Sequence, residues 1–362
     1  MKNTVVRCYV GCNTGSEDRQ ALHVLECDTE TGAIRIVQSV KGPQGTTYFK
    51  PDDEGRWLYS IIGDEKNPKL AGTAVRFPIS GGMLGEMECL AELPCPAPCH
   101  VTLSPDGSTM AFAAYAAGTT GVLPVGGGAV KSVVLSDEGV GPNKTRQKKA
   151  YAHFVFYTPD AKCLGVINLG CDRIHFFDPQ TMTEDKTMMI RTDPGDGPRH
   201  AVWSNDRRFL FVLNELGSTV SSYSFDGHGF SRVGKWTMLP GEFDPRNADG
   251  SSEGTKAAAI KLTADGKLLM ASNRGHDSIA LYAVDEQTGR LTLRNIAKLT
   301  GKSPRDFELM PGERFVVVGH KMSNEIQVYA FDRVACTLTP VGTPVPAWRP
   351  LCFKFHPTSQ QS

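Results

Sequence analysis

The chain has 362 residues, with 39 Lys or Arg and 39 Asp or Glu, so its formal net charge is zero. Proteins that bind nucleic acid or a membrane surface usually carry a basic excess, and no long run of one sign occurs here. A short basic cluster at residues 144–149 is interpreted as a solvated loop. No segment approaches the roughly 18 apolar residues of a membrane span, and we do not expect the start to be a signal peptide. We therefore expect neither a nucleic-acid nor a membrane partner.

Ten cysteines are too few for a disulfide scaffold at this length. Several of them lie inside strand-like patterns, among them Cys8, Cys27 and Cys163, which is typical of buried free thiols in a reducing compartment. Two pairs are spaced four residues apart, Cys8 with Cys12 and Cys95 with Cys99, but turns and prolines interrupt them. The sequence predicts a cytoplasmic protein without a metal site.

In chain order, three strand-like segments come first, at residues 5–10, 21–27 and 33–38. A hairpin pattern of two apolar strands around a polar turn then recurs with a period of about fifty residues, which marks a repeat architecture. The turns of the six copies fall at Glu54, Asp106, Asp160, Asp206, Asp265 and Gly312. The aspartates among them are interpreted as structural, because Asp satisfies backbone donors in turns.

Each repeat continues with a third strand and a fourth strand. Residues 219–225 and 278–284 alternate as third strands, and residues 291–296 follow as a fourth strand. No stretch shows a sustained helical period. Four antiparallel strands per repeat at this spacing are typical of a β-propeller, in which each sheet is one blade around a central channel.

The two ends of the chain supply one more blade. Residues 351–355 look like a first strand with nothing after it, and the three N-terminal segments look like the missing second, third and fourth strands. Pairing them closes the ring and hides its edges. The prediction is an all-β, seven-bladed β-propeller with four antiparallel strands per blade. It forms one domain over 1–362, whose closing blade comes from about 1–42 plus 350–357.

A propeller gathers polar residues from separate blades at one mouth of its channel. The start of each innermost strand and the end of each second strand lie on the same face of the disc. In one hairpin, Arg199 and His200 start the first strand and Glu215 follows the second, so these groups should approach each other. His153 and Arg274 occupy corresponding positions in neighbouring blades. Charged groups in a partly desolvated pocket are candidates for chemistry.

Several motifs, in the same order, are those of a known family. They are Pro-Cys-His-Val-Thr-Leu-Ser-Pro-Asp-Gly (98–107), Arg146-Gln147 ahead of Ala152-His153, Gly-Pro-Arg-His (197–200), Val-Leu-Asn-Glu-Leu (212–216), Ser-Asn-Arg-Gly-His-Asp-Ser-Ile (272–279) and Pro-Arg-Asp-Phe (304–307). The chain resembles the seven-bladed propeller lactonases, which include propeller-type 6-phosphogluconolactonases and 3-carboxymuconate lactonizing enzymes. The resemblance covers essentially the whole chain, including the split closing blade.

The resemblance implies a cytoplasmic enzyme that opens or closes the lactone of a small anionic acid, without a metal or an organic cofactor. The expected catalytic residues are Glu215, His153 and His200. The expected substrate-binding residues are Arg199, Arg274, His100, Arg305 and His276. An alternative for Arg305 is an ion pair with Asp306 between blades. A monomer or weak homo-oligomer is expected.

For hydrolysis, Glu215 or a histidine acting with it would be the general base, and His153 or His200 the acid. Arg199 and Arg274 would hold an anionic group or the developing oxyanion. Two alternatives stay open: a cycloisomerase that forms a lactone from an unsaturated acid, and a propeller that only binds a sugar acid or a protein. The chain also departs from the family's usual residues, for example at Ala259, Ala114 and Ile62.

Overall fold

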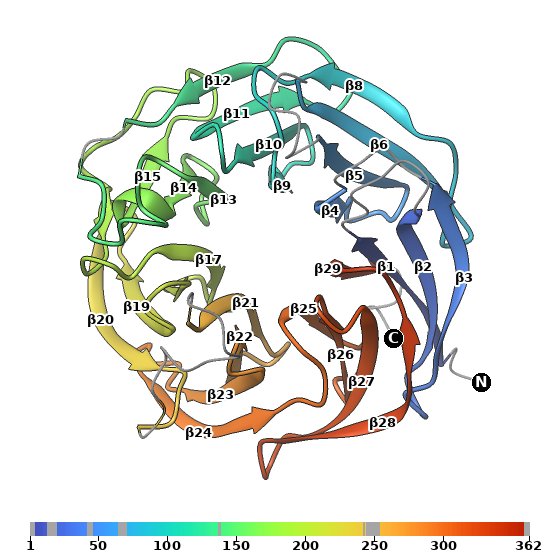
Figure 1. The fold of residues 1–362 in the computed structure, drawn as a ribbon. Helices are drawn as coiled ribbons and strands as arrows, with labels where there is room; N and C mark the ends of the chain where they lie inside the picture. Colours follow the sequence, from blue (N-terminus) through green and yellow to red (C-terminus); the bar gives the residue numbers. More distant parts are fainter. Residues whose placement is uncertain are drawn as a thin grey trace.

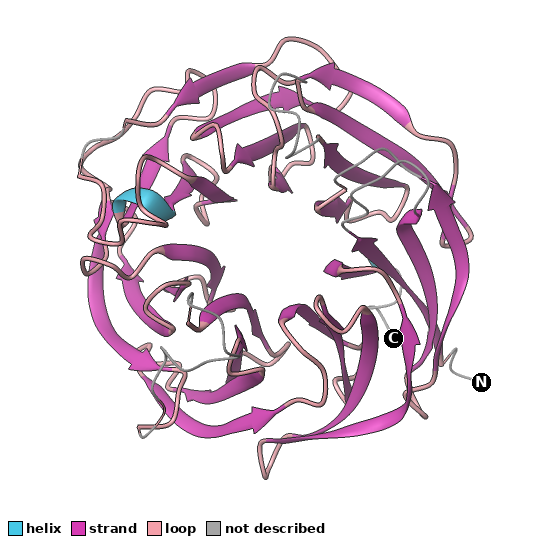
Figure 2. Ribbon diagram, viewed as in Figure 1, coloured by secondary structure: helices cyan, strands magenta, loops and turns pink. Residues whose placement is uncertain are grey.

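The computed structural model describes residues 4–12, 20–41, 46–63, 71–136, 139–241, 243 and 254–357. Seven sheets stand around a central channel like the blades of a propeller (Figure 1). Strands account for nearly all regular structure in these residues, together with a short 3₁₀ helix, η1 (Leu169–Cys171) (Figure 2). The predicted seven-bladed propeller is confirmed. In the described part of the chain, no helix is long and apolar enough to cross a membrane.

The first three blades follow one another along the chain. Blade one contains β4 (Tyr48–Pro51), β5 (Trp57–Ile62), β6 (Thr73–Ser80) and β8 (Glu88–Glu92), with the short β7 (Met83–Leu84) paired to the end of β6. Blade two contains β9 (His100–Leu103), β10 (Thr109–Ala114), β11 (Thr119–Pro124) and β12 (Lys131–Val134). Blade three contains β13 (Ala152–Tyr157), β14 (Leu164–Asn168), β15 (Arg173–Phe177) and β16 (Ile190–Arg191).

The remaining blades complete the ring. Blade four contains β17 (Pro198–Trp203), β18 (Phe209–Asn214), β19 (Thr219–Phe225) and β20 (Phe230–Thr237). Blade five contains β21 (Lys256–Leu262), β22 (Leu268–Arg274), β23 (Ser278–Val284) and β24 (Leu291–Lys298). Blade six contains β25 (Pro304–Leu309), β26 (Phe315–His320), β27 (Glu325–Asp332) and β28 (Thr337–Pro346). Blade seven contains β29 (Pro350–Phe355), β1 (Val5–Cys12), β2 (Gln20–Asp28) and β3 (Ile34–Lys41).

Burial within a blade is highest in its second strand. All six residues of the second strand β18 are buried, because the neighbouring blades cover both of its faces. Most of the outermost strand β28 is exposed or half-buried. This difference in burial explains why the second strands are continuous apolar runs in the sequence, whereas the fourth strands show a weaker apolar pattern.

The recurring hairpin turn has a shared hydrogen-bond pattern. In blade four the Ser204 hydroxyl donates to Asp206, and the same carboxylate accepts the backbone N–H of Arg208. The corresponding Ser or Thr to Asp bond occurs in blades two, three and five. An aspartate that satisfies turn donors in this way has a structural role, as predicted. These turns lie at the opposite ends of the inner strands from the residues discussed below.

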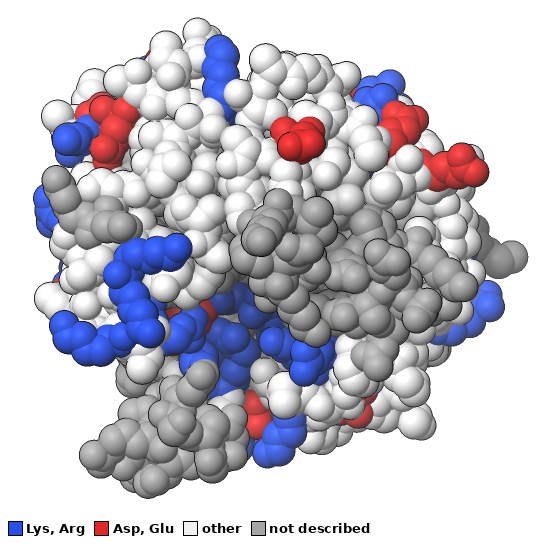
Figure 3. Space-filling model, turned by 45° about the horizontal axis from the view of Figure 1, so that its top comes forward, with Lys and Arg blue, Asp and Glu red and all other residues white. Residues whose placement is uncertain are grey.

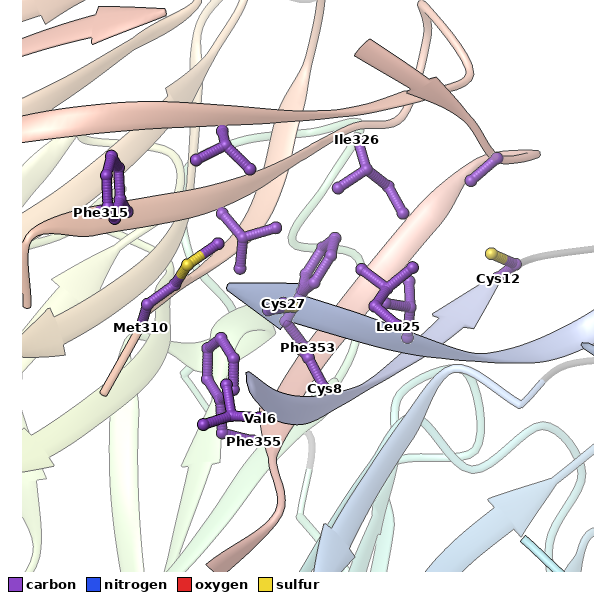
Figure 4. Packing of buried hydrophobic residues seen from close by; sticks show 14 residues of the cluster. Val6, Cys8, Cys12, Leu25, Cys27, Met310, Phe315, Ile326, Phe353 and Phe355 are labelled. Carbon is purple, nitrogen blue, oxygen red and sulfur yellow. The ribbon is translucent and has the colours of Figure 1, made fainter. Parts of the chain in front are cut away.

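Blade seven joins both ends of the chain. β29 pairs antiparallel with β1 from Cys8 opposite Phe355 to Cys12 opposite Pro350, with one irregularity. Figure 4 shows the apolar cluster that packs this blade against blade six; Phe353 and Phe355 of β29 lie beside Cys8 of β1. Each of the seven contacts between adjacent blades has a cluster of this kind in the described residues.

The structure differs from the predicted strands in two details, and part of the predicted closing blade lies outside the described residues. The first strand of blade five begins at Lys256, three residues before Ala259, where the apolar pattern of the repeated hairpin starts. The alanines between them give no strand signal, because alanine has a low strand propensity. Blade one has a fifth short strand in its sheet. Residues 1–3, 13–19 and 42, which the prediction assigned to the closing blade, lie outside the described residues.

The closing blade can be tested by removing one ring from its core. Phe353 is fully buried between blades six and seven. Phe353→Ala should lower the free energy of unfolding by about 3–5 kcal/mol, measured by urea denaturation, because it leaves a cavity. The control Val134→Ala changes a side chain that is 68% exposed on β12 and should stay within about 0.5 kcal/mol of the wild type. Equal effects of the two substitutions would contradict closure by β29.

Candidate active site

A cavity of about 370 Å³ lies at the end of the channel where the inner strands begin. Its volume is within the range of small-molecule sites, roughly 300–1,000 Å³. Residues of blades two to seven line it. The charged ones are Arg146, Arg199, Glu215, Arg274, Arg305 and Lys321. Lys and Arg side chains gather in the hollow near the middle of this face (Figure 3).

β-Bulges direct one residue from each of four inner strands into this cavity. In β13, β17, β25 and β29 the register skips one residue near the start of the strand. The skipped residues are His153, Arg199, Arg305 and Leu351, and all four line the cavity. An extra residue in a bulge is not paired across the ladder, and the bulge re-aims its side chain. The same device therefore places an imidazole and two guanidinium groups at one mouth.

Glu215 is the carboxylate of the cavity and contacts three arginines. Its Oε1 accepts a hydrogen bond from Arg146 at 2.6 Å. Its Oε2 accepts one from Arg199 and is 3.1 Å from Nη2 of Arg274. The side chain is only 1% exposed. Burial alone would raise the pKa of Glu215, but the charges of Arg199, Arg274 and Arg146 lower this pKa well below its usual range. Glu215 is therefore an anion at neutral pH.

Local backbone geometry fixes the place of Glu215. Its N–H donates to the Gly197 carbonyl at 2.7 Å, and its own carbonyl accepts the N–H of Ala257 in blade five at 3.0 Å. Gly197 has a φ of +56°, and a Cβ there would meet Leu216 at 2.6 Å. The glycine that precedes Pro198 and Arg199 thus permits the close approach that holds the carboxylate beside its arginine.

Arg199 also contacts His153. Its Nη1 donates to Nε2 of His153 at 2.6 Å, and its Nε donates to the Ala258 carbonyl at 2.8 Å. An Nε2 that accepts a hydrogen bond carries no proton, so His153 is neutral in this arrangement. Burial and the charge of Arg199 lower the pKa of His153 well below its usual range. Nη2 of Arg199 donates to no acceptor among the described residues, so it has free donors.

The other two predicted histidines of the rim lie one layer deeper. The rings of His153 and His200 are 5.4 Å apart and those of His200 and His100 are 6.0 Å apart. His100 packs between Tyr48 and Phe154, and its Nδ1 accepts the backbone N–H of Val155. Neither His100 nor His200 lines the cavity. His100 and His200 each come one residue after a residue that lines the cavity, Cys99 and Arg199 respectively. Successive side chains of a strand point in different directions, so the two imidazoles do not face the mouth.

His276 lies apart from the other predicted residues. It follows Gly275, whose φ of +91° turns the chain after β22. Its Nδ1 is 2.8 Å from the Ser278 hydroxyl, and its ring packs edge-on against Phe243. His276 does not line the cavity, so the structure does not bring it to the expected substrate site.

Arg305 lines the cavity, as expected. Its neighbour Asp306 lies 3.7 Å from the amine of Lys261 in blade five and accepts the backbone N–H of Phe353 in blade seven. The ion pair of Asp306 between blades is therefore made with Lys261.

Three cavity residues with a hydroxyl or a charged side chain were not among the predicted site residues: Tyr115, Arg146 and Lys321. Arg146 reaches Glu215 from a loop 69 residues earlier in the chain, and the same Nη2 donates to the Tyr115 hydroxyl at 3.3 Å. A signal existed, because Arg146 and Gln147 lie just ahead of His153, but the loop resembled a solvated basic segment. The contact between Arg146 and Glu215 could not be predicted, because the two residues are 69 positions apart in the sequence.

The cavity lining is strongly cationic. Among the described lining residues, five carry a positive charge and Glu215 alone carries a negative charge, since His153 is neutral. Arginine forks suit carboxylate and phosphate groups. The arrangement can bind a small anion and offers a buried carboxylate as a proton acceptor. No group of three or more His, Cys, Asp or Glu in the described residues could hold a metal ion.

Comparison with known proteins identifies the family. The family model described as "Lactonase, 7-bladed beta-propeller" matches residues 7–355. The chain belongs to this lactonase family. The 6-phosphogluconolactonase of Bacillus subtilis is 28% identical over 356 residues, which cover 96% of this chain and 97% of that protein. An uncharacterized protein of Staphylococcus saprophyticus is 27% identical over 354 residues and covers 96% of this chain and 98% of its own.

Solved structures resemble this lactonase-family propeller over nearly its whole length. A putative 6-phosphogluconolactonase from Bacteroides fragilis has 27% identity and a TM-score of 0.82, and the match covers 98% of this chain and 99% of that one. A periplasmic gluconolactonase of Pseudomonas aeruginosa has 24% identity and a TM-score of 0.86, covering 97% and 99%. The second likeness is evidence for the fold alone.

The buried histidines of this lactonase-family protein predict how its stability depends on pH. Burial and Arg199 lower the pKa of His200, and burial also lowers those of His100 and His153. The unfolded chain, with histidine pKa values of about 6.5, then binds more protons than the folded chain below that pH. The stability that depends on these histidines being neutral is present above about pH 6.5 and is lost as the pH falls below that value.

His200→Gln should remove one histidine that is protonated in the unfolded chain below about pH 6.5 but neutral in the folded chain. The slope of unfolding free energy against pH should decrease by about 1.4 kcal/mol per pH unit between pH 6 and 5, measured by urea denaturation. The matched control His228→Gln changes an exposed histidine and should keep the wild-type slope. An unchanged slope in His200→Gln would show that His200 is protonated in the folded protein.

Proposed function

We propose that this protein hydrolyses the lactone of a sugar acid that carries an anionic group, with 6-phosphogluconolactone as the leading substrate. One observation carries the proposal: a buried carboxylate lies in a small cavity surrounded by five cationic side chains. The names of relatives in Bacillus subtilis and Formosa agariphila support the same activity.

Glu215 is the proposed general base. It takes a proton from a water molecule whose oxygen attacks the lactone carbonyl carbon, and the carbonyl π electrons move to the carbonyl oxygen. When the tetrahedral intermediate collapses, the bond from that carbon to the ring oxygen breaks. The ring oxygen leaves as an alkoxide and receives the proton from Glu215, so that water and lactone give one hydroxy acid. General acid–base catalysis of this kind contributes about 10²–10⁴ in rate.

Arg199 is the proposed donor to the oxyanion. Its guanidinium group is already fixed by hydrogen bonds to Glu215, His153 and the Ala258 carbonyl. Its Nη2 has no acceptor among the described residues, which leaves donors for a developing negative charge. Donors that are held in place before the reaction need no reorganisation during it, which is the basis of oxyanion stabilisation.

The histidines have a smaller part in this proposal than the sequence suggested. Nε2 of His153 is occupied by Arg199, and His200 does not line the cavity. Burial and the charge of Arg199 keep both pKa values low, so neither imidazole is protonated at neutral pH. We therefore assign His153 the role of positioning Arg199, and the proton that protonates the leaving oxygen is the one Glu215 removed from water.

The first experiment is an assay with defined lactones. Purified protein should accelerate hydrolysis of 6-phosphogluconolactone above the spontaneous rate, followed by acid release. Uncharged gluconolactone should react more slowly, because it lacks the group that the cationic lining attracts. Formation of a lactone from an unsaturated acid without hydrolysis of either lactone would favour a cycloisomerase. Binding of 6-phosphogluconate without any turnover would favour a protein that only binds sugar acids.

Glu215→Gln should lower kcat for 6-phosphogluconolactone by about 10²–10⁴. The amide keeps the shape of the side chain but cannot accept the proton. The control Glu92→Gln alters an exposed glutamate on β8 and should retain wild-type kcat. Circular dichroism should confirm that both variants fold. A loss much smaller than 100-fold in folded Glu215→Gln would remove Glu215 from the mechanism.

A further inference from the structure

The two oxygens of Glu215 are held unequally. Oε2 contacts both Arg199 and Arg274, whereas Oε1 accepts its hydrogen bond from Arg146 alone. Removing Arg146 would therefore free one oxygen and leave the other in place. The remaining two arginines would keep the carboxylate oriented, because they contact the same atom.

Arg146 is also the least constrained of the three guanidinium groups. Arg199 donates to the Ala258 carbonyl, and Arg274 donates to the carbonyls of Lys256 and Ala257. The other side-chain hydrogen bond of Arg146 goes to the Tyr115 hydroxyl, at 3.3 Å. Its side chain is 26% exposed, against 4% for Arg199 and 14% for Arg274. An anion that enters the cavity can therefore bind the Arg146 guanidinium with less disruption of existing hydrogen bonds than at Arg199 or Arg274.

The backbone that carries Arg146 is anchored, so only its side chain needs to move. The Arg146 N–H donates to Asn143 Oδ1. The adjacent Gln147 donates to Asp172 at 2.8 Å and to the Leu169 carbonyl at 3.0 Å. A long side chain on a fixed loop can change rotamer without altering the sheets.

We propose that Arg146 couples recognition of the substrate's anionic group to the release of Glu215 as a base. The inference rests on the proposed lactonase function. The phosphate or carboxylate of the substrate draws the Arg146 guanidinium away from Oε1. That oxygen then accepts the proton of the attacking water, while Arg199 and Arg274 still hold Oε2.

This coupling makes Arg146 a specificity-determining residue as well as a binding residue. Without an anion, the guanidinium occupies the oxygen that the reaction needs, so an uncharged lactone is hydrolysed slowly even when bound. With an anion, the positive charge moves from the carboxylate to the ligand, and the pKa of Glu215 rises toward the ordinary range. The anionic group therefore increases kcat and not only affinity.

The test supplies the anion separately from the lactone. Uncharged gluconolactone is the substrate and inorganic sulfate the activator, with chloride keeping ionic strength constant. Sulfate should raise wild-type kcat about tenfold in a saturable way and move the acid limb of the pH profile up by about one unit. Arg146→Met should show the raised kcat without sulfate and should not respond to it. Lys148→Met removes an exposed charge from the same loop and should behave as wild type.

The outcomes separate the two proposals. If 6-phosphogluconolactone is hydrolysed but sulfate leaves wild-type kcat unchanged, or activates Arg146→Met equally, the coupling is wrong and the lactonase function stands. If no lactone is hydrolysed above the spontaneous rate, the function fails and the coupling fails with it. The wild-type response to sulfate needs no variant, so it tests the coupling even if Arg146→Met does not fold.

Discussion

Pairing of β29 with β1 is the constraint on which the rest of the structure depends. It joins the two ends of the chain in one blade, so that no sheet in the described ring is left with an open neighbour. A closed ring fixes the tilt of every blade relative to the channel. The starts of the inner strands then meet at one mouth, although they are separated by about fifty residues in sequence. Convergence of the site is a result of closure.

Within that frame, the arginines around Glu215 determine what the mouth can do. A buried charge is costly unless it is paired, and removal of one partner from a buried pair typically destabilises a protein by about 3–5 kcal/mol. Glu215 is matched by three guanidinium groups, yet the cavity retains a positive excess. The carboxylate is thus stable as an anion and the site remains attractive to a second anion. Structural pairing and ligand recognition use the same side chains.

The fold could be read from the sequence because its signals are local and repeated. Turn residues such as Asp206 and the apolar runs beside them recur with a regular spacing, and each copy supports the others. The pairing of Arg199 with Glu215 was also predictable, since one hairpin carries both. His100 and His200 were placed on the wrong level, because a shift of one residue changes the direction of a side chain and a bulge is invisible in the pattern. The position of the Arg146 side chain could not be predicted, because Arg146 lies in a loop and has no strand register that fixes its direction.

The bulges in β13, β17, β25 and β29 have a consequence for how such a protein can change. The residue that each bulge adds is not paired across the ladder, so a change of its side chain disturbs no cross-strand pair. Here these positions hold histidine, two arginines and leucine. A mutation at one of them changes the lining of the mouth without changing the register of its strand. At Arg199 the same change also removes a partner of buried Glu215, so there specificity and stability change together.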